Sequence, residues 1–136
     1  MPRTRKSYRL FLKEPQRTSC PFCELPDKRT LVVKKHLFII KNIYPYDWWD
    51  FRKVTAHLMV VPKNHVESLQ KLSLAALKEY WEVLIDYESQ GYSISTRPQG
   101  SIRKSVAHQH THLIKTGGPL TKFMIFIKKP YWFIFK

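Results

Sequence analysis

The chain has 136 residues, the size of one ordinary domain, which leaves no room for a second catalytic domain. Hydrophobic residues make up 43% of it and aromatic residues 14%, so the composition predicts a packed core and excludes a disordered chain. The 24 Lys and Arg against 10 Asp and Glu give a net charge of +14, which favours an anionic partner such as a nucleotide or a nucleic acid. No apolar run approaches the roughly 18 residues that span a bilayer, so we expect no membrane partner.

The N-terminal segment, residues 1–19, is basic and polar and contains Pro2 and Pro15. We expect a flexible, extended arm there, followed by a single domain over residues 20–136. Strands rich in Leu, Val, Ile and Phe are predicted at Thr30–Val33, Leu37–Ile40 and Ala56–Val61. Between them, Tyr46–Arg52 follows neither the helical nor the strand period, and we interpret it as a loop with aromatic anchors.

A helix is predicted over Leu74–Ser89, with Ser73 as its N-cap and Gly91 as its stop. The helical period places an apolar stripe toward the core, made of Leu77, Tyr80, Trp81, Leu84 and Ile85. Further strands are expected at Val106–Ile114, Phe123–Ile127 and Tyr131–Phe135. We expect the last two strands at a sheet edge or a dimer interface.

Three histidines alternate along one of these strands, at His108, His110 and His112. A period of two sends all three rings to the same face of a strand. A neutral imidazole can attack phosphorus and later leave, and neighbouring imidazoles can bind phosphate oxygens. Ser105 and Lys104 lie nearby in the sequence and can contact a leaving oxygen and a phosphate. Alternating histidines alone suit a metal site equally well.

The only two cysteines, Cys20 and Cys23, are too close in sequence for an ordinary disulfide and suit metal or redox chemistry. A closed tetrahedral zinc site needs two more ligands, and His65 and His108 are candidates. A pair of buried thiols is the alternative. The scarcity of cysteine predicts a reducing, cytoplasmic location.

The order of these motifs resembles the histidine triad (HIT) superfamily over most of residues 20–114. The matching segments are Cys20-Pro-Phe-Cys23, Asn42-Ile-Tyr-Pro45, His57-Leu-Met-Val-Val-Pro-Lys-Asn-His65 and Ser105-Val-Ala-His108-Gln-His110-Thr-His112-Leu-Ile. The resemblance implies an α+β fold with a mainly antiparallel sheet of about five strands, one main helix and a short second one. It also implies a homodimer.

The same resemblance assigns roles to individual residues. His110 is the expected nucleophile at an α-phosphate, with Ser105 at the leaving oxygen and His112 at the phosphate. His57 and Asn42 are expected in the substrate pocket with Lys104. A structural Zn²⁺ is expected on the four ligands Cys20, Cys23, His65 and His108.

Three departures from the family pattern are visible. Gln109 and Thr111 are polar where the family has apolar residues, so we expect the face behind the triad to be solvated or differently packed. Asn42 stands where many members have Asp. Arg103-Lys104 replaces a common Gly-Gln.

The sequence thus predicts a nucleotide hydrolase or transferase that cleaves a phosphoramidate, a dinucleoside polyphosphate or a nucleotidyl conjugate, with a purine as the preferred base. The alternative is a zinc-stabilised protein that binds single-stranded nucleic acid through its charge and through Trp48 and Trp49, or an enzyme that processes nucleic-acid ends.

Overall fold

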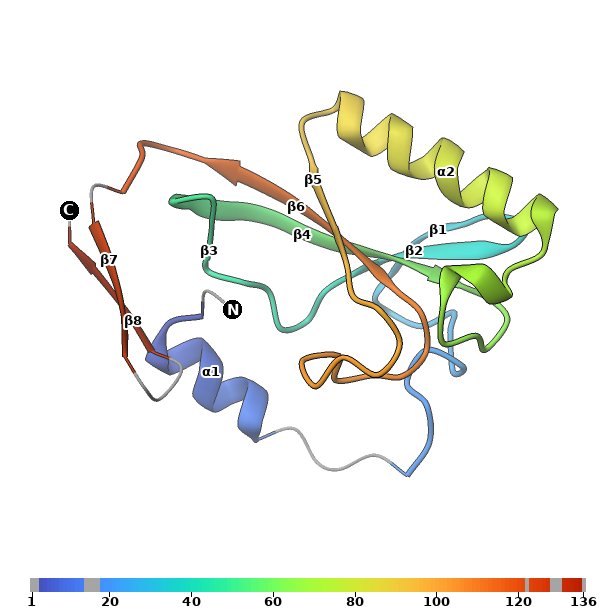
Figure 1. Cartoon of the computed structure of the whole chain (residues 1–136), viewed down its shortest axis with the longest axis horizontal. Coiled ribbons are helices and arrows are strands. Elements are labelled where there is room, and N and C mark those ends of the chain that lie inside the picture. Colours follow the sequence, from blue (N-terminus) through green and yellow to red (C-terminus); the bar gives the residue numbers. More distant parts are fainter. Residues whose placement is uncertain (1–2, 14–17, 122, 128–130, 136) are drawn as a thin grey trace.

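The structure is a computed structural model, and it describes residues 3–13, 18–121, 123–127 and 131–135. Its elements follow one another as Figure 1 shows. In chain order they are α1 (Arg5–Leu12), β1 (Thr30–Val33), β2 (Leu37–Lys41), β3 (Trp48–Trp49), β4 (Arg52–Pro62), a 3-10 turn (Leu69–Lys71), α2 (Leu74–Ser89), β5 (Ser93–Thr96), β6 (Thr111–Gly117), β7 (Phe123–Ile127) and β8 (Tyr131–Phe135).

The main sheet has six strands, all paired antiparallel, in the order β1-β2-β4-β6-β5 with β3 paired to β4. The predicted α+β class is confirmed, with one strand more than expected. Alternate residues of β2 point to opposite faces, and both faces are covered. Leu37 and Ile39 pack with α2, and Phe38 and Ile40 pack with Phe22 on the opposite face. The second face is the one that carries the candidate site.

Helix α2 begins and ends where the sequence predicts. The side chain of Ser73 accepts a hydrogen bond from the Ala76 amide, and Gly91 follows the helix with a φ of 85°. The predicted core stripe is partly wrong, because Trp81 is 53% exposed and Ile85 is 63% exposed. The residues of α2 that are buried are Ala76, Tyr80, Val83 and Leu84. The core face is therefore rotated from the predicted stripe and leaves apolar side chains in contact with solvent.

The N-terminal segment is not extended throughout, since residues 5–12 form α1. Thr4 is the N-cap and accepts a hydrogen bond from the Ser7 amide. The Asp47 carboxylate accepts hydrogen bonds from the Thr4 amide and from the Ser7 hydroxyl. A carboxylate at a helix N-terminus stabilises the helix by satisfying unpaired amides and by its charge. The helix therefore depends on a residue 40 or more positions away along the chain, which local patterns do not reveal.

The segment Tyr46–Arg52 is not a plain loop. Trp48 and Trp49 pair with β4 across a two-residue turn at Asp50 and Phe51, whose φ angles are 48° and 58°. Two positive φ values are typical of the tight turn that matches the twist of a hairpin. The turn lacks glycine, and this hides it from the sequence pattern.

The predicted strand over Val106–Ile114 begins later, at Thr111, so that only His112 of the three histidines lies in β6. Strands β7 and β8 occur as predicted but form their own two-stranded sheet, and they do not extend the edge of the main sheet. Neither helix in the described parts of the chain has the length and apolar character needed to cross a membrane.

Candidate active site and metal centre

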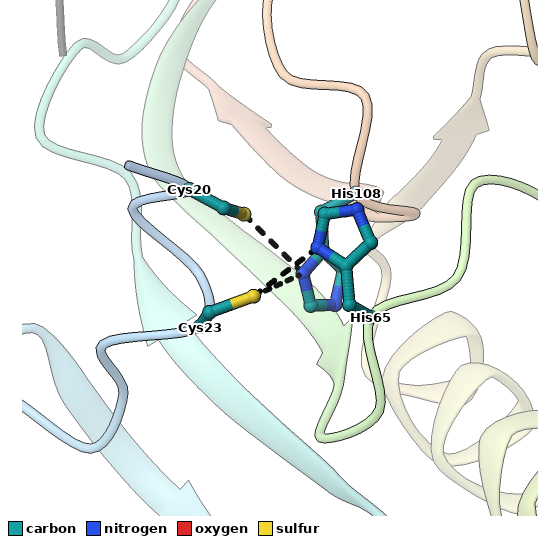
Figure 2. A group of neighbouring side chains, drawn as sticks. All are labelled: Cys20, Cys23, His65 and His108. Atoms are coloured by element: carbon teal, nitrogen blue, oxygen red, sulfur yellow. Dashed lines mark hydrogen bonds between the residues drawn. The ribbon is translucent and has the colours of Figure 1, made fainter. Parts of the chain in front are cut away.

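Four predicted metal ligands come together from three distant segments (Figure 2). The ligand atoms of Cys20, Cys23, His65 and His108 all lie within 4.8 Å of one another. The Sγ of Cys23 lies 3.1 Å from Nδ1 of His65 and 3.7 Å from Nδ1 of His108, and Cys20 Sγ lies 3.5 Å from the latter. Zn–S and Zn–N bonds of about 2.3 and 2.0 Å at tetrahedral angles give S···N separations of about 3.5 Å. The donor set therefore fits a tetrahedral metal ion.

The ring of His108 has the orientation and the proton position that a metal ligand requires. Its Nε2 lies 2.9 Å from the carbonyl oxygen of Pro62, which can only accept a hydrogen bond. The proton is therefore on Nε2, and Nδ1 directs its lone pair toward the two sulfur atoms. Two thiolates and two imidazoles are ligands that zinc prefers.

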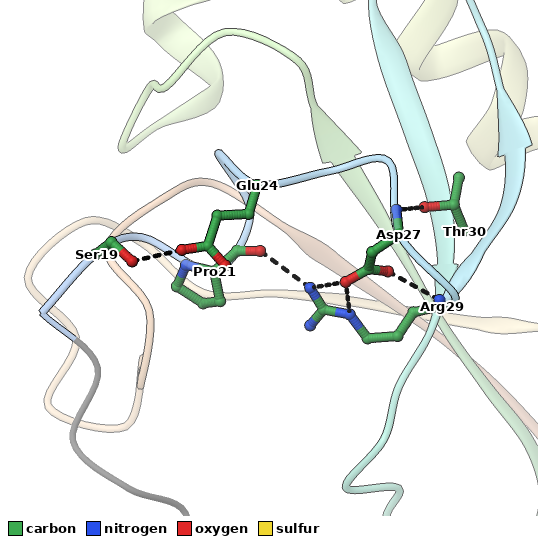
Figure 3. Close-up of polar contacts among 6 residues, drawn as sticks. All are labelled: Ser19, Pro21, Glu24, Asp27, Arg29 and Thr30. Atoms are coloured by element: carbon green, nitrogen blue, oxygen red, sulfur yellow. Dashed lines mark hydrogen bonds and ion pairs between the residues drawn. The ribbon is translucent and has the colours of Figure 1, made fainter.

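The loop that carries the cysteines is held by polar contacts (Figure 3). Arg29 is 9% exposed, and its guanidinium donates to the Pro21 carbonyl at 3.0 Å and pairs with the Asp27 carboxylate at 2.7 Å. Ser19 donates to Glu24 across the same loop at 2.5 Å. These contacts stabilise the loop itself independently of a metal ion.

His110 is oriented by the backbone next to it. Its Nδ1 lies 2.8 Å from the carbonyl oxygen of His108, so Nδ1 carries the proton and Nε2 carries the lone pair. The ring is 5% exposed and packs edge-on against Phe22. Burial lowers the pKa of His110, the positive charges of Lys104 and Arg97 lower it further, and the hydrogen bond to the His108 carbonyl opposes the shift. The result is a neutral imidazole, which is the nucleophilic form.

His112 is oriented by a chain of hydrogen bonds through His57. The Tyr46 amide donates to Nδ1 of His57 at 3.0 Å, and His57 Nε2 lies 2.9 Å from Nδ1 of His112. Because Nδ1 of His57 accepts, the neutral ring has its proton on Nε2 and donates it to His112. His112 in turn has its proton on Nε2. His112 is therefore a hydrogen-bond donor at the site.

Both rings of this chain are neutral. Burial lowers the pKa of His57 to about 3, with a further contribution from the charge of Arg3. Burial also lowers the pKa of His112 to about 2, and electrostatic interactions with His110, His57, Arg97 and Arg3 lower it further. The direction of the hydrogen bonds is thus unchanged over the physiological pH range.

The face behind the triad is packed with polar groups and is not solvated. Gln109 is 2% exposed and Thr111 is 1% exposed. The Gln109 amide donates to Thr96 Oγ1 at 2.8 Å and accepts from Lys104 Nζ at 2.9 Å, while Tyr80 donates to Thr111 Oγ1 at 2.8 Å. Each of these polar side chains therefore has a hydrogen-bond partner, which offsets the free-energy cost of removing it from water.

A cavity of about 80 Å³ brings part of the predicted site together. His110, His112, Ser105 and Asn42 line it, and Ser105 is exposed there. Asn42 is buried, its Oδ1 accepts from the Tyr44 amide and its Nδ2 lies 3.2 Å from His57 Nε2. The cavity is small beside ligand pockets of roughly 300 Å³ and above. A larger cavity of about 450 Å³ lies beyond His57 and Asn42, but His110 and His112 do not line it.

Lys104 and His57 do not line the smaller cavity. The ammonium group of Lys104 donates to the carbonyl of Glu67 at 2.8 Å and to Gln109, so it supports the scaffold. Several lining residues were missed by the sequence patterns, among them Arg3, Phe22 and Arg103. Phe22 lies between the two cysteines, so the metal motif itself is the signal that could have found it. Arg3 belongs to the basic arm, and no local signal distinguishes it from its neighbours.

Comparison with known proteins identifies the fold. No protein-family model and no curated relative matches the sequence. Solved structures do match, among them a HIT family hydrolase from Clostridium thermocellum, at 21% identity and a TM-score of 0.53 over 76% of this chain and 97% of that one. A histidine triad protein from Clostridium difficile matches at 22% identity and a TM-score of 0.51 over 79% and 98% of the two chains. A HIT family protein from Bacillus anthracis matches at 18% identity and a TM-score of 0.57 over 74% and 75%.

The chain therefore has the fold of the histidine triad proteins. Its Cys20-x-x-Cys23 motif and the histidines beside it occupy one cluster of that fold, in a geometry that could hold zinc.

Proposed function

We propose that the chain is a nucleotide hydrolase or nucleotidyltransferase that acts through a covalent nucleotidyl-histidine on His110. One observation carries this proposal: Nδ1 of His110 is engaged by the His108 carbonyl, which leaves the Nε2 lone pair of a neutral ring free to act as a nucleophile at the cavity. The solved structures of the same fold include a protein described as a HIT family hydrolase, which supports an enzyme of this kind.

In the first step, Nε2 of His110 attacks the α-phosphorus of a bound nucleotide. A P–N bond forms, and the bond from phosphorus to the leaving group breaks, with its electron pair staying on the leaving atom. The exposed Ser105 hydroxyl is at the same cavity and can donate a hydrogen bond to that atom. The Nε2–H of His112 donates to a non-bridging phosphate oxygen, whose negative charge increases in the transition state.

In the second step, water or another acceptor attacks the same phosphorus. The P–N bond breaks, its electron pair returns to Nε2 of His110, and the proton of the acceptor leaves with solvent. Splitting one displacement into two is the usual benefit of a covalent intermediate.

We propose zinc as the ion on Cys20, Cys23, His65 and His108. Four protein ligands close the coordination shell, as in structural zinc sites, so the ion stabilises the fold and takes no part in phosphate chemistry. It would fix the segment from His108 to His110 relative to the Cys20–Cys23 loop. Thiolate ligands also fit the predicted cytoplasmic location.

A purine nucleotide is the substrate we propose to test first. Phe22, Ile43, Met59 and Val106 are among the residues that line the cavity and offer apolar contacts to a base. A purine has more aromatic area to bury than a pyrimidine and so gains more from such contacts.

Intact-mass spectrometry tests the proposed chemistry. The protein is incubated briefly with an adenosine phosphoramidate or a dinucleoside polyphosphate and quenched without acid. We expect an added mass of one nucleotide on the native chain and none on His110→Ala, with His36→Ala as a matched control that keeps the adduct. The proposal is contradicted if the native chain neither forms an adduct with these two kinds of substrate nor turns either of them over.

A second candidate is binding of single-stranded nucleic acid, and the basic surface of α1 favours it. Lys6, Arg9 and Lys13 are exposed along this helix. Trp48 and Trp49 contribute less than expected, because both are half-buried in the hairpin and Trp49 stacks on Tyr46. Binding of a labelled oligonucleotide that survives His110→Ala, without turnover of any nucleotide by the native chain, would favour this candidate.

We also propose a homodimer. The exposed apolar residues of α2, Leu74 at 83%, Trp81 at 53% and Ile85 at 63%, need a partner surface, and β5 with Ile94 ends the strand order of the main sheet. Trp81→Glu should give a monomer in analytical ultracentrifugation, whereas Glu82→Lys, at a neighbouring exposed position, should not.

A further inference from the structure

Arg3 reaches the candidate active site from outside the sheet that builds it. It precedes α1, yet its side chain is only 6% exposed and lines the same cavity as His110 and His112. Its Nη2 donates to the carbonyl oxygen of Tyr44 at 2.9 Å. The guanidinium also lies over two aromatic rings, 4.5 Å from the centre of Phe11 and 5.0 Å from that of Tyr46. A charged side chain is rarely buried to this degree unless hydrogen bonds or opposite charges offset the cost of removing it from water.

The position of Arg3 is set by the docking of α1. The Asp47 carboxylate accepts from the Thr4 amide, the residue next to Arg3, at 2.5 Å. Further along the helix, Phe11 packs edge-on against Tyr44, with ring centres 5.8 Å apart. The guanidinium is therefore held from both sides, by the start of the helix and by an aromatic residue two turns later.

The charge of this cavity is positive. Three arginines line it, Arg3, Arg29 and Arg103, and no Asp or Glu is among its lining residues in the described parts of the chain. Arg29 is neutralised by its ion pair with Asp27. Arg103 is exposed and belongs to the loop that also contains Ser105. Arg3 and Arg103 thus supply cationic groups from two segments that are far apart in the sequence.

We propose that Arg3 is a phosphate-binding residue that selects nucleotides with at least one phosphate beyond the α-phosphate. This inference rests on the proposed nucleotide site and names its substrate class. The planar guanidinium forms paired, charge-assisted hydrogen bonds with phosphate oxygens. A phosphate oxygen can replace the Tyr44 carbonyl as acceptor and is the stronger one, because it is charged. His112 and Ser105 serve the reacting phosphate, and Arg3 with Arg103 binds the phosphates that follow it.

Calorimetric titration with AMP and ADP tests this assignment without relying on turnover. All titrations use full-length protein on the His110→Ala background, so that no ligand is consumed. We expect ADP to bind at least about tenfold more tightly than AMP, because the second phosphate gains charge-assisted hydrogen bonds. Arg3→Ala should bring the ratio of the two affinities close to one, mainly by weakening ADP. Arg9→Ala removes the same charge from an exposed position of α1 and should keep the ratio.

A conservative variant separates phosphate binding from a purely structural role. Arg3→Lys keeps the positive charge but loses the planar group that pairs with phosphate oxygens and lies over Phe11 and Tyr46, so it should keep part of the preference for ADP. The assignment is overturned if Arg3→Lys loses the preference as fully as Arg3→Ala, if Arg9→Ala loses it equally, or if the parent protein does not distinguish AMP from ADP.

The outcome is independent of the covalent chemistry. A preference for ADP that depends on Arg3, in a chain that forms no nucleotide adduct, retains the phosphate-binding role and rejects the enzymatic proposal. An adduct on His110 in a chain that does not prefer ADP supports the enzymatic proposal and rejects the phosphate-binding role of Arg3.

Discussion

Nε2 of His57 lies 2.9 Å from Nδ1 of His112, and this contact determines what His112 presents to the cavity. His57 receives a hydrogen bond from the Tyr46 amide and passes its own proton on, so His112 faces the site as a donor. The position of the proton on His112, for which we propose a catalytic role, is therefore decided by the backbone amide of Tyr46 acting through His57.

Replacing His57 should impair catalysis without removing a group that touches phosphate. In His57→Gln, the proton of His112 is no longer confined to Nε2, because the amide can either donate or accept. We expect the rate of adduct formation to fall by about 10- to 100-fold, the usual loss when a supporting partner is removed. Rapid-quench kinetics followed by mass spectrometry measures this rate. An unchanged rate in a folded His57→Gln protein would contradict the role of the chain.

Acid should destabilise the fold through the same two histidines. Their pKa values in the folded state are about 3 for His57 and about 2 for His112, below the value of about 6.5 in an unfolded chain. Below pH 6.5 the unfolded state therefore binds more protons, so the free energy of unfolding decreases as pH falls toward 3. Each group contributes about 1.4 kcal/mol per pH unit within this window.

Urea unfolding at pH 7.5 and pH 5.0 measures the effect. The difference between the two free energies should become smaller in His57→Gln, which has one titrating group fewer. A difference that is the same in both proteins would assign the acid sensitivity to other groups.

Loss of one metal ligand should remove zinc and lower stability. Metal analysis of the purified protein is expected to find close to one zinc ion per chain, and none in His65→Ala. His36→Ala is the matched control, because the hydrogen bonds of His36 that the structure shows are made by its backbone, from its amide to Glu79 and from the Lys63 amide to its carbonyl. Zinc binding that persists in His65→Ala, or zinc that is absent from the native protein, would exclude the four-ligand site.

The polar pair behind the triad should behave as a unit. Tyr80 donates to Thr111 Oγ1 at 2.8 Å in a buried position, where burial raises the pKa of the tyrosine. Thr111→Val should cost about 1 to 3 kcal/mol, since it removes an acceptor from a buried hydroxyl. Adding Tyr80→Phe should recover part of this loss, because both polar groups are then gone. Chemical denaturation of the two single variants and the double variant gives the free energies of unfolding for a double-mutant cycle. If the losses of the two single variants add up to that of the double variant, the pair is not coupled.

Local patterns in the sequence were sufficient for several features of this protein. The bounds of α2 follow from Ser73 and Gly91, because capping is decided within a few residues. The Cys20-x-x-Cys23 motif likewise predicted a metal cluster, because its spacing is local. The prediction that all three histidines lie on one strand was wrong, because only His112 lies in β6. The α+β class followed from the order of motifs that resemble the histidine triad family.

Other features depend on contacts between residues that are far apart along the chain. Whether Gln109 and Thr111 face water or a packed interior is decided by Lys104, Thr96 and Tyr80, which three different segments supply. The late start of β6, the exposure of Trp81 and the entry of Arg3 into the site likewise follow from packing. The sequence by itself therefore determined which chemical groups are present and how each is presented locally. Only the tertiary structure decided which of them meet, because burial and hydrogen-bond partners are properties of the assembled core.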